Sequence, residues 1–169
     1  PELEGPSLEA HKAMVKELRN KAMTEGFLSE ADLVIRPLRM DDLCTTPNGS
    51  PDYNVGITAA TYTDLTNQTI DNDRWIGING VSNLTLNGGT AITSATAPVA
   101  TQVRIQRKGA FSRYWDIKHL AFGDHNYGFV DDPVIVDPNT NLTVSIWARS
   151  AGSAVGSNFA LLGVVAERR

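Results

Sequence analysis

Cysteine, histidine and long apolar stretches are all scarce in this chain of 169 residues. Cys44 is the single cysteine, which excludes an internal disulfide framework and a zinc site built from several thiolates. The longest apolar stretch covers residues 159–166, far short of the roughly 20 residues that a membrane-spanning helix needs. We therefore expect a globular protein with no membrane partner.

Basic residues are too few for a typical nucleic-acid-binding domain. Lysine and arginine number 15 against 19 aspartates and glutamates, so the formal net charge is -4 and the pI is about 5.3. Such a balance gives no positive footprint for a phosphate backbone, and we expect no nucleic-acid partner. The 41% of hydrophobic residues and the mean hydropathy of -0.19 are typical of a folded domain.

Charge is distributed unevenly along the chain. Residues 1–43 carry fifteen charged side chains, whereas residues 44–101 carry five and no lysine. We interpret this shift as a boundary between two structural regimes. Residues 1–43 are predicted to form an N-terminal helix and extended arm, and residues 44–169 a β-sandwich domain.

The first part has the periodicity of an amphipathic helix. Ser7 is a candidate N-cap, and Gly26 a candidate C-terminal residue because glycine accepts the left-handed conformation found at helix ends. Ser29 followed by Asp32 predicts a further short turn, and residues 33–35 predict the start of extended structure. The stripe expected to be buried consists of Leu8, His11, Met14, Val15, Leu18 and Ala22.

From Cys44 onward the sequence favours β-sheet. Twelve of the fifteen threonines lie in residues 45–101, and a β-branched side chain fits a pleated surface. Residues 99–107 and 141–149 alternate between apolar and polar positions, which predicts strands with one buried and one solvated face. The candidate strands are Val55–Thr63, Arg74–Asn79, Ser82–Leu86, Val99–Arg107, Ser112–Ala121, Tyr127–Val136, Asn141–Arg149 and Phe159–Glu167, with turns at sites such as Asn79-Gly80 and Asp137-Pro-Asn139.

Eight strands without an intervening helix-length segment predict an all-β fold. We expect an antiparallel eight-stranded jelly-roll sandwich with an N-terminal helical arm. An immunoglobulin-like sandwich is the nearest alternative, but it would have seven strands and a second cysteine.

Motifs that would carry chemistry are missing from the sequence. In Gly152-Ser-Ala-Val-Gly156 the serine follows the first glycine directly, unlike the nucleophile elbow G-x-S-x-G. A metal-binding cupin needs a closely spaced histidine pair and a third histidine, whereas His119 and His125 stand six apart. Asp71-Asn-Asp73 lacks the glycine and the distal glutamate of a calcium loop and is interpreted as a turn. We expect no enzyme, no cofactor, and no catalytic, cofactor-binding or metal-binding residue.

Aromatic and basic residues offer candidates for partner contact instead. Trp147 falls on the polar side of its strand, where tryptophan can anchor an interface, whereas Trp75 and Trp115 have apolar neighbours and are expected in the core. Basic residues around the Gly109 turn predict either a solvated face or a contact patch for an acidic protein, and both interpretations stay open. The candidate partner-binding residues are Trp147, Arg104, Arg107, Lys108 and Arg113.

Several segments beyond Val55 also carry a family resemblance. They are Thr61–Ile70, Arg74–Val81, Trp115-Asp116, Gly128–Val136 and Leu161–Glu167. On these segments the chain resembles the jelly-roll decoration proteins, or cement proteins, of tailed-bacteriophage heads.

The resemblance implies a viral structural protein that is made in the host cytoplasm and resides in the virion, on the capsid surface. Its partners would be the major capsid protein, which it bridges, and copies of itself, commonly as a homotrimer. The segment 1–43 would then extend onto a neighbouring subunit. The alternatives are a single-jelly-roll capsid or head-fibre base protein, a carbohydrate-binding module that uses Trp147 with a nearby tyrosine, and a cupin-like enzyme.

Overall fold

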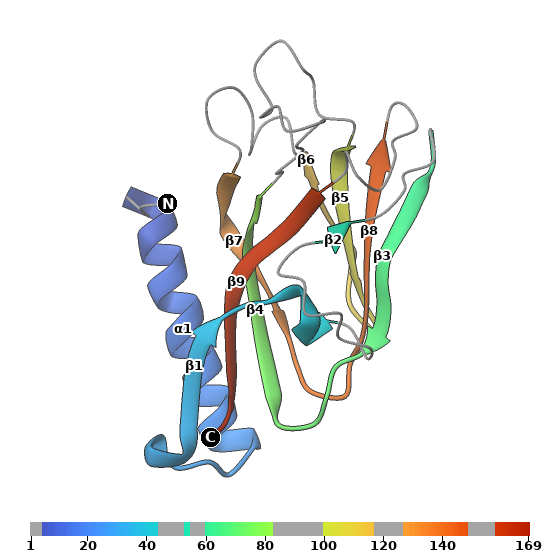
Figure 1. The fold of residues 1–169 in the computed structure, drawn as a ribbon. Coiled ribbons are helices and arrows are strands. Elements are labelled where there is room, and N and C mark those ends of the chain that lie inside the picture. Colours follow the sequence, from blue (N-terminus) through green and yellow to red (C-terminus); the bar gives the residue numbers. More distant parts are fainter. Residues whose placement is uncertain (1–4, 44–52, 55–59, 83–99, 117–126, 149–157) are drawn as a thin grey trace.

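The computed structural model describes residues 5–43, 53–54, 60–82, 100–116, 127–148 and 158–169. These residues form two antiparallel sheets that share one core, with a single N-terminal helix against one of the sheets (Figure 1). The prediction of an antiparallel β-sandwich with an N-terminal helix is confirmed.

The two sheets contain five and four strands. The larger has the order β1 (Leu33–Pro37), β9 (Asn158–Arg168), β4 (Arg74–Ser82) and β7 (Tyr127–Val136), and β2 (Tyr53–Asn54) also pairs with β9. The smaller has the order β3 (Tyr62–Thr69), β8 (Asn141–Ala148), β5 (Ala100–Arg107) and β6 (Arg113–Asp116). The helical segments are α1 (Gly5–Glu25) and the short 3₁₀ turns η1 (Glu30–Asp32) and η2 (Met40–Leu43).

The core between the sheets follows the alternation that the sequence predicts. Val103 and Ile105 on β5 and Ile146 on β8 are fully buried, and they belong to the same apolar cluster as Ile76 and Ile78 on β4. Polar residues at the intervening positions of β5 and β8 point to the other side of the sheet. The two clearest strand predictions of the sequence are thus confirmed.

A second core lies between α1 and the outer face of the five-stranded sheet. Met14, Leu18 and Ala22 on the helix are buried against Trp75 on β4 and Val164 on β9. In Figure 1 the helix runs alongside β7, β9 and β4. The predicted buried stripe of the helix is therefore used, and it faces this chain's own sheet.

Residues 33–43 are part of the sandwich as well. Strand β1 pairs along its whole length with β9, and Met40 and Leu43 of η2 enter the core between the sheets. The boundary at residue 43 stays a prediction, but residues 5–43 share both apolar clusters with the strands.

The predicted turn at Asn79-Gly80 is wrong. Both residues lie inside β4, at a bulge where the register with β7 and with β9 shifts. Asn79 is 1% exposed, and its Nδ2 lies 2.9 Å from Nδ1 of His11 on the helix. A side-chain partner on α1 thus allows an amide to lie in a buried strand, where the sequence pattern alone favours a turn.

Two other details differ from the sequence-based expectations. Ser7 is not the N-cap, because α1 begins at Gly5 and the Ser7 hydroxyl donates to Asp131 Oδ1 on β7. Strand β3 shares only Tyr62 and Thr63 with the predicted strand Val55–Thr63; residues 55–59 lie outside the described residues. The predicted strand residues 83–86, 99, 117–121 and 149 and the sites at His119, His125 and Gly152–Gly156 also lie outside them.

The end of α1 uses Phe27 where the sequence favours Gly26. The amides of Gly26 and Leu28 both donate to the Ala22 carbonyl, and the left-handed residue between them is Phe27, with φ 52°. Gly26 is needed for another reason: a Cβ there would lie 2.3 Å from the Trp75 ring. Phe27 thus has a disfavoured backbone conformation, and its side chain is 92% exposed.

Replacing Phe27 with glycine should therefore stabilise the protein. Glycine removes the penalty of a left-handed non-glycine residue, and the exposed ring loses little burial, so we expect a gain of about 1 kcal/mol. Urea denaturation measures the change. Phe111→Gly is the matched control, because Phe111 is 93% exposed but has no positive φ. Equal effects of the two substitutions would contradict the prediction.

Leu18→Ala tests whether α1 belongs to the same cooperative unit as the sheets. Leu18 is fully buried, so truncation should lower the free energy of unfolding by about 2–4 kcal/mol. Met23→Ala, on the same helix at 40% exposure, should cost about 0.5 kcal/mol or less. Urea denaturation, followed by a spectroscopic signal of the β-sheets, measures the effect of both substitutions. An unchanged midpoint for Leu18→Ala would mean that the helix unfolds separately.

Candidate interaction surface

The five candidate partner-binding residues all lie on the four-stranded sheet or at its β5–β6 turn, but they do not form one patch. Trp147 on β8 and Arg104 on β5 occupy outward positions of the sheet, as their alternation with buried residues requires. Lys108 is exposed in the turn. Arg107 and Arg113 occupy the opposite, inward positions, next to the edge of the sandwich.

Arg107 and Arg113 connect the two sheets. Arg107 Nη1 donates to the carbonyl oxygen of Ile135 on β7 at 2.7 Å, and Arg113 forms an ion pair with Asp132, also on β7. Their guanidinium groups thus tie β5 and β6 to the edge strand of the other sheet. The structure gives these two predicted contact residues a stabilising position within the chain.

The outward side of the four-stranded sheet is called the open face below. Two rows of side chains extend across it from β3 to β6, because residues paired across antiparallel strands lie side by side. The open face is defined by one row with Tyr62, Trp147, Gln102 and Asp116, and a second row with Asp64, Ser145, Arg104 and Tyr114.

Hydrogen bonds hold the polar side chains of the open face together. The Tyr62 hydroxyl donates to Gln102 Oε1, and Gln102 Nε2 donates to Asp116 Oδ1 at 3.3 Å. The Ser145 hydroxyl donates to Asp64 Oδ1 at 2.5 Å. These bonds link all four strands from β3 to β6, so the side chains are fixed relative to one another.

Arg104 lies at the centre of this arrangement. Its Cζ is 3.9 Å from the centre of the Tyr62 ring, a cation–π geometry. The guanidinium reaches over β8 to do so, and Ser145 beneath is completely buried. Among the described residues Arg104 has no ion-pair partner, and its buried Nε has no hydrogen-bond partner.

The aromatic residues of the open face are only partly available to a ligand. Tyr114 is 55% exposed and Trp147 is half-buried. Tyr62 lies directly opposite Trp147 in the strand register, as a sugar platform would need, but the Arg104 guanidinium occupies one face of the Tyr62 ring. A sugar could not stack on that face unless Arg104 moved.

Sequence reasoning found Trp147 and Arg104 but left Tyr62 and Tyr114 unassigned. Tyr114 lies between Arg113 and Trp115, so the two-residue period of β6 places it on the outward face. That period could have identified Tyr114 from the sequence. Tyr62 lay inside the predicted strand Val55–Thr63, but its contact with Arg104 depends on a pairing of strands that the sequence does not show.

A separate cluster of charges joins residues 33–43 to the sandwich. The Arg36 guanidinium makes paired contacts with Asp42, at 2.6 and 2.8 Å, and with Glu167 on β9, at 2.7 and 3.1 Å. Arg74 lies 3.6 Å from the second Glu167 oxygen. Burial alone would raise the pKa of the Asp42 carboxyl, but hydrogen bonds from Arg36 and from the Arg39 amide outweigh it and hold that pKa below its ordinary value.

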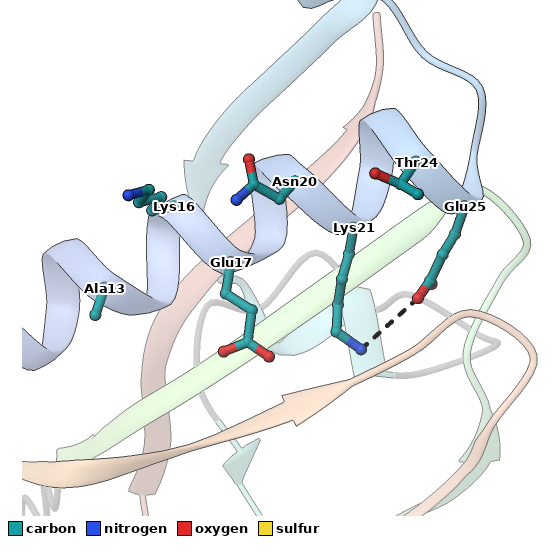
Figure 2. A pocket seen from close by; sticks show the side chains of 7 residues that line it. All are labelled: Ala13, Lys16, Glu17, Asn20, Lys21, Thr24 and Glu25. Carbon is teal, nitrogen blue, oxygen red and sulfur yellow. Dashed lines mark ion pairs between the residues drawn. The ribbon is translucent and has the colours of Figure 1, made fainter.

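A hollow with a volume of about 410 Å³ lies along one side of α1 (Figure 2). Its charged side chains come from the helix alone, and Lys21 among them is paired with Glu25 and with Asp137, the latter at 2.9 Å. The hollow is open to solvent, and Lys21 within it already forms ion pairs with carboxylates of the same chain.

No group of three or more metal-ligating side chains occurs among the described residues, and none of the described helices has the length and apolar character needed to cross a membrane. Asp71 and Asp73, interpreted from the sequence as turn residues, lie between β3 and β4 and form ion pairs with Arg74 and with Arg168 at the end of β9. Comparisons of the chain with protein-family models, curated proteins and solved structures find no match. The family resemblance stays a prediction.

Asp42 gives the charge cluster a defined pH dependence. Because its pKa is lower in the folded state than in the unfolded chain, its contribution is complete above the unfolded value of about 4 and is lost as the pH falls through the folded value. Asp42→Asn should therefore destabilise the protein by about 2–3 kcal/mol at pH 7, and by progressively less below pH 4.

Urea denaturation between pH 3 and pH 7 tests this expectation. Asp41→Asn is the matched control, because Asp41 is a neighbour in η2 without an ion pair in the described part of the chain. A stability difference between Asp42→Asn and the unchanged protein that does not vary with pH would contradict the assignment.

Proposed function

We propose that the sandwich is a jelly roll. Its strand pairs are nested: β5 with β6, β4 with β7, β3 with β8, and β1 and β2 with β9. A long antiparallel ribbon that folds over itself into two sheets has this order, with neighbouring turns of the ribbon joined by the pairs β4–β9 and β5–β8. The nested order supports a jelly roll over other sandwich topologies.

We propose further that the protein is a non-enzymatic structural subunit of a virus, a decoration or cement protein on the outside of an icosahedral head. The observation that carries this proposal is the asymmetry of the slab: α1 covers one outer face, and the other outer face presents a fixed array of arginine, tyrosine and tryptophan. These residue types dominate protein–protein interfaces. The array suits contact with a protein neighbour.

Cementing follows from mass action in this proposal. A subunit that binds the assembled shell and not the free capsid protein stabilises the shell by an amount that grows with its own concentration. A homotrimer would add avidity, because the second and third contacts become intramolecular once the first has formed. Hydrogen bonds along the open face, such as the one from Tyr62 to Gln102, order its side chains before binding, so less entropy is lost when the subunit binds.

Purified virus particles provide the test. Quantitative mass spectrometry should find the chain in the virion at a copy number that scales with the number of major capsid subunits, and heads assembled without it should bind added protein on their outer surface. A copy number matching a single vertex would assign it to a portal or fibre attachment, and its absence would remove the virion assignment. Closed particles formed by the pure protein would identify a shell protein instead.

A further inference from the structure

The open face is the outer sheet surface that this chain does not cover with a described element. The corresponding face of the five-stranded sheet is occupied by α1, which buries Met14, Leu18 and Ala22 against it. The open face has no such covering within the described ranges, yet it is as strongly organised, through the bonds that run from Tyr62 to Asp116. This organisation is more than a solvated polar surface requires, because water would satisfy the same groups.

Arg104 differs from the arginines whose guanidinium groups contact polar groups of described residues. Arg107 donates to the Ile135 carbonyl oxygen. Arg36, Arg74, Arg113 and Arg168 each pair with a carboxylate of the same chain. The Arg104 guanidinium is held by the Tyr62 ring without such a pair in the described part of the structure. The guanidinium is thus held in one orientation, and its charge is not compensated by an ion pair. A preoriented, unpaired guanidinium is suited to bind an anionic group.

We propose that the open face docks onto a protein surface and that Arg104 receives a single aspartate or glutamate carboxylate from it, with Tyr114 and Trp147 making the flanking apolar contacts. The inference rests on the proposed function, under which that surface is the outside of the head shell. It names the face of the subunit that touches the shell and the chemistry of the contact.

The charges around Arg104 select this partner. Asp64 shares its row and Asp116 lies in the neighbouring row, so negative groups flank the guanidinium. A single carboxylate can reach Arg104 between them, whereas a nucleic-acid backbone would bring a run of phosphates against both carboxylates. A neutral sugar would need the Tyr62 face that Arg104 covers. Both remain as outcomes of the test.

Binding to heads that lack the protein provides the test, with the full chain and three variants. Arg104→Gln should weaken binding about 10- to 100-fold, as expected for the arginine of an interface centre. Tyr114→Ser should weaken it less, because the Tyr114 ring is 55% exposed and makes no hydrogen bond through its hydroxyl in the described structure. Arg168→Gln is the matched control: it removes the same charge from an exposed position at the end of β9, outside the open face, and should change binding by less than about 3-fold.

The outcomes separate the inference from the proposed function. If the unchanged protein fails to bind heads, both are overturned. If it binds and Arg104→Gln, shown by its urea midpoint to be folded, binds equally well, the docking face is wrong and the proposed function stands. Loss of polysaccharide or DNA binding in Arg104→Gln without loss of head binding would overturn the carboxylate-bearing protein partner, and so would dissociation of a homotrimer by that substitution alone.

Discussion

Burial of strand β4 on both faces is the constraint on which the rest of this structure depends. Strand β4 is buried from Trp75 to Ser82, because one side meets the core between the sheets and the other meets α1. A buried amide in β4 needs a polar partner, and Asn79 Nδ2 finds it in His11 Nδ1 on the helix, while Asn79 Oδ1 has no hydrogen-bond partner among the described residues. The helix is therefore a required layer of the fold.

Close backbone approach follows from this double burial. A Cβ on Gly77 would lie 2.6 Å from Met14 Sδ, and one on Gly163 would lie 1.9 Å from the Gly77 carbonyl oxygen. Side chains at these two positions would hold the helix off β4 and β4 off β9. Space is equally limited at Gly26, where the absence of a side chain leaves room for the Trp75 ring. The residue with the left-handed conformation at the end of the helix is Phe27.

The same constraint explains which parts of the fold the sequence could predict. Strands β5 and β8 are solvated on one side, so their two-residue period assigned Ile105 and Ile146 to the core correctly. Strand β4 has no solvent-exposed face, so its sequence does not alternate between apolar and polar residues. The Asn79-Gly80 dipeptide therefore led to the prediction of a turn, although tertiary contacts keep both residues in the strand. The apolar stripe of α1 could be predicted from the sequence, but such a stripe does not identify the surface against which it packs. The docking of α1 onto its own sheet could therefore not be derived.

For the candidate surface, the sequence could place side chains on a face but could not distinguish committed charges from uncommitted ones. Arg104, Arg107 and Arg113 are close together in the chain and look alike in the sequence. The sheet edges separate them, because Arg107 and Arg113 reach strand β7 while Arg104 lies on the far side against Tyr62. Clustering of basic residues in the sequence therefore does not show which charges are uncommitted, since Arg107 and Arg113 contact polar groups within the chain. An arginine held by an aromatic ring instead of a carboxylate keeps its charge available, and that distinction depends on the partner that each guanidinium meets across the sheets.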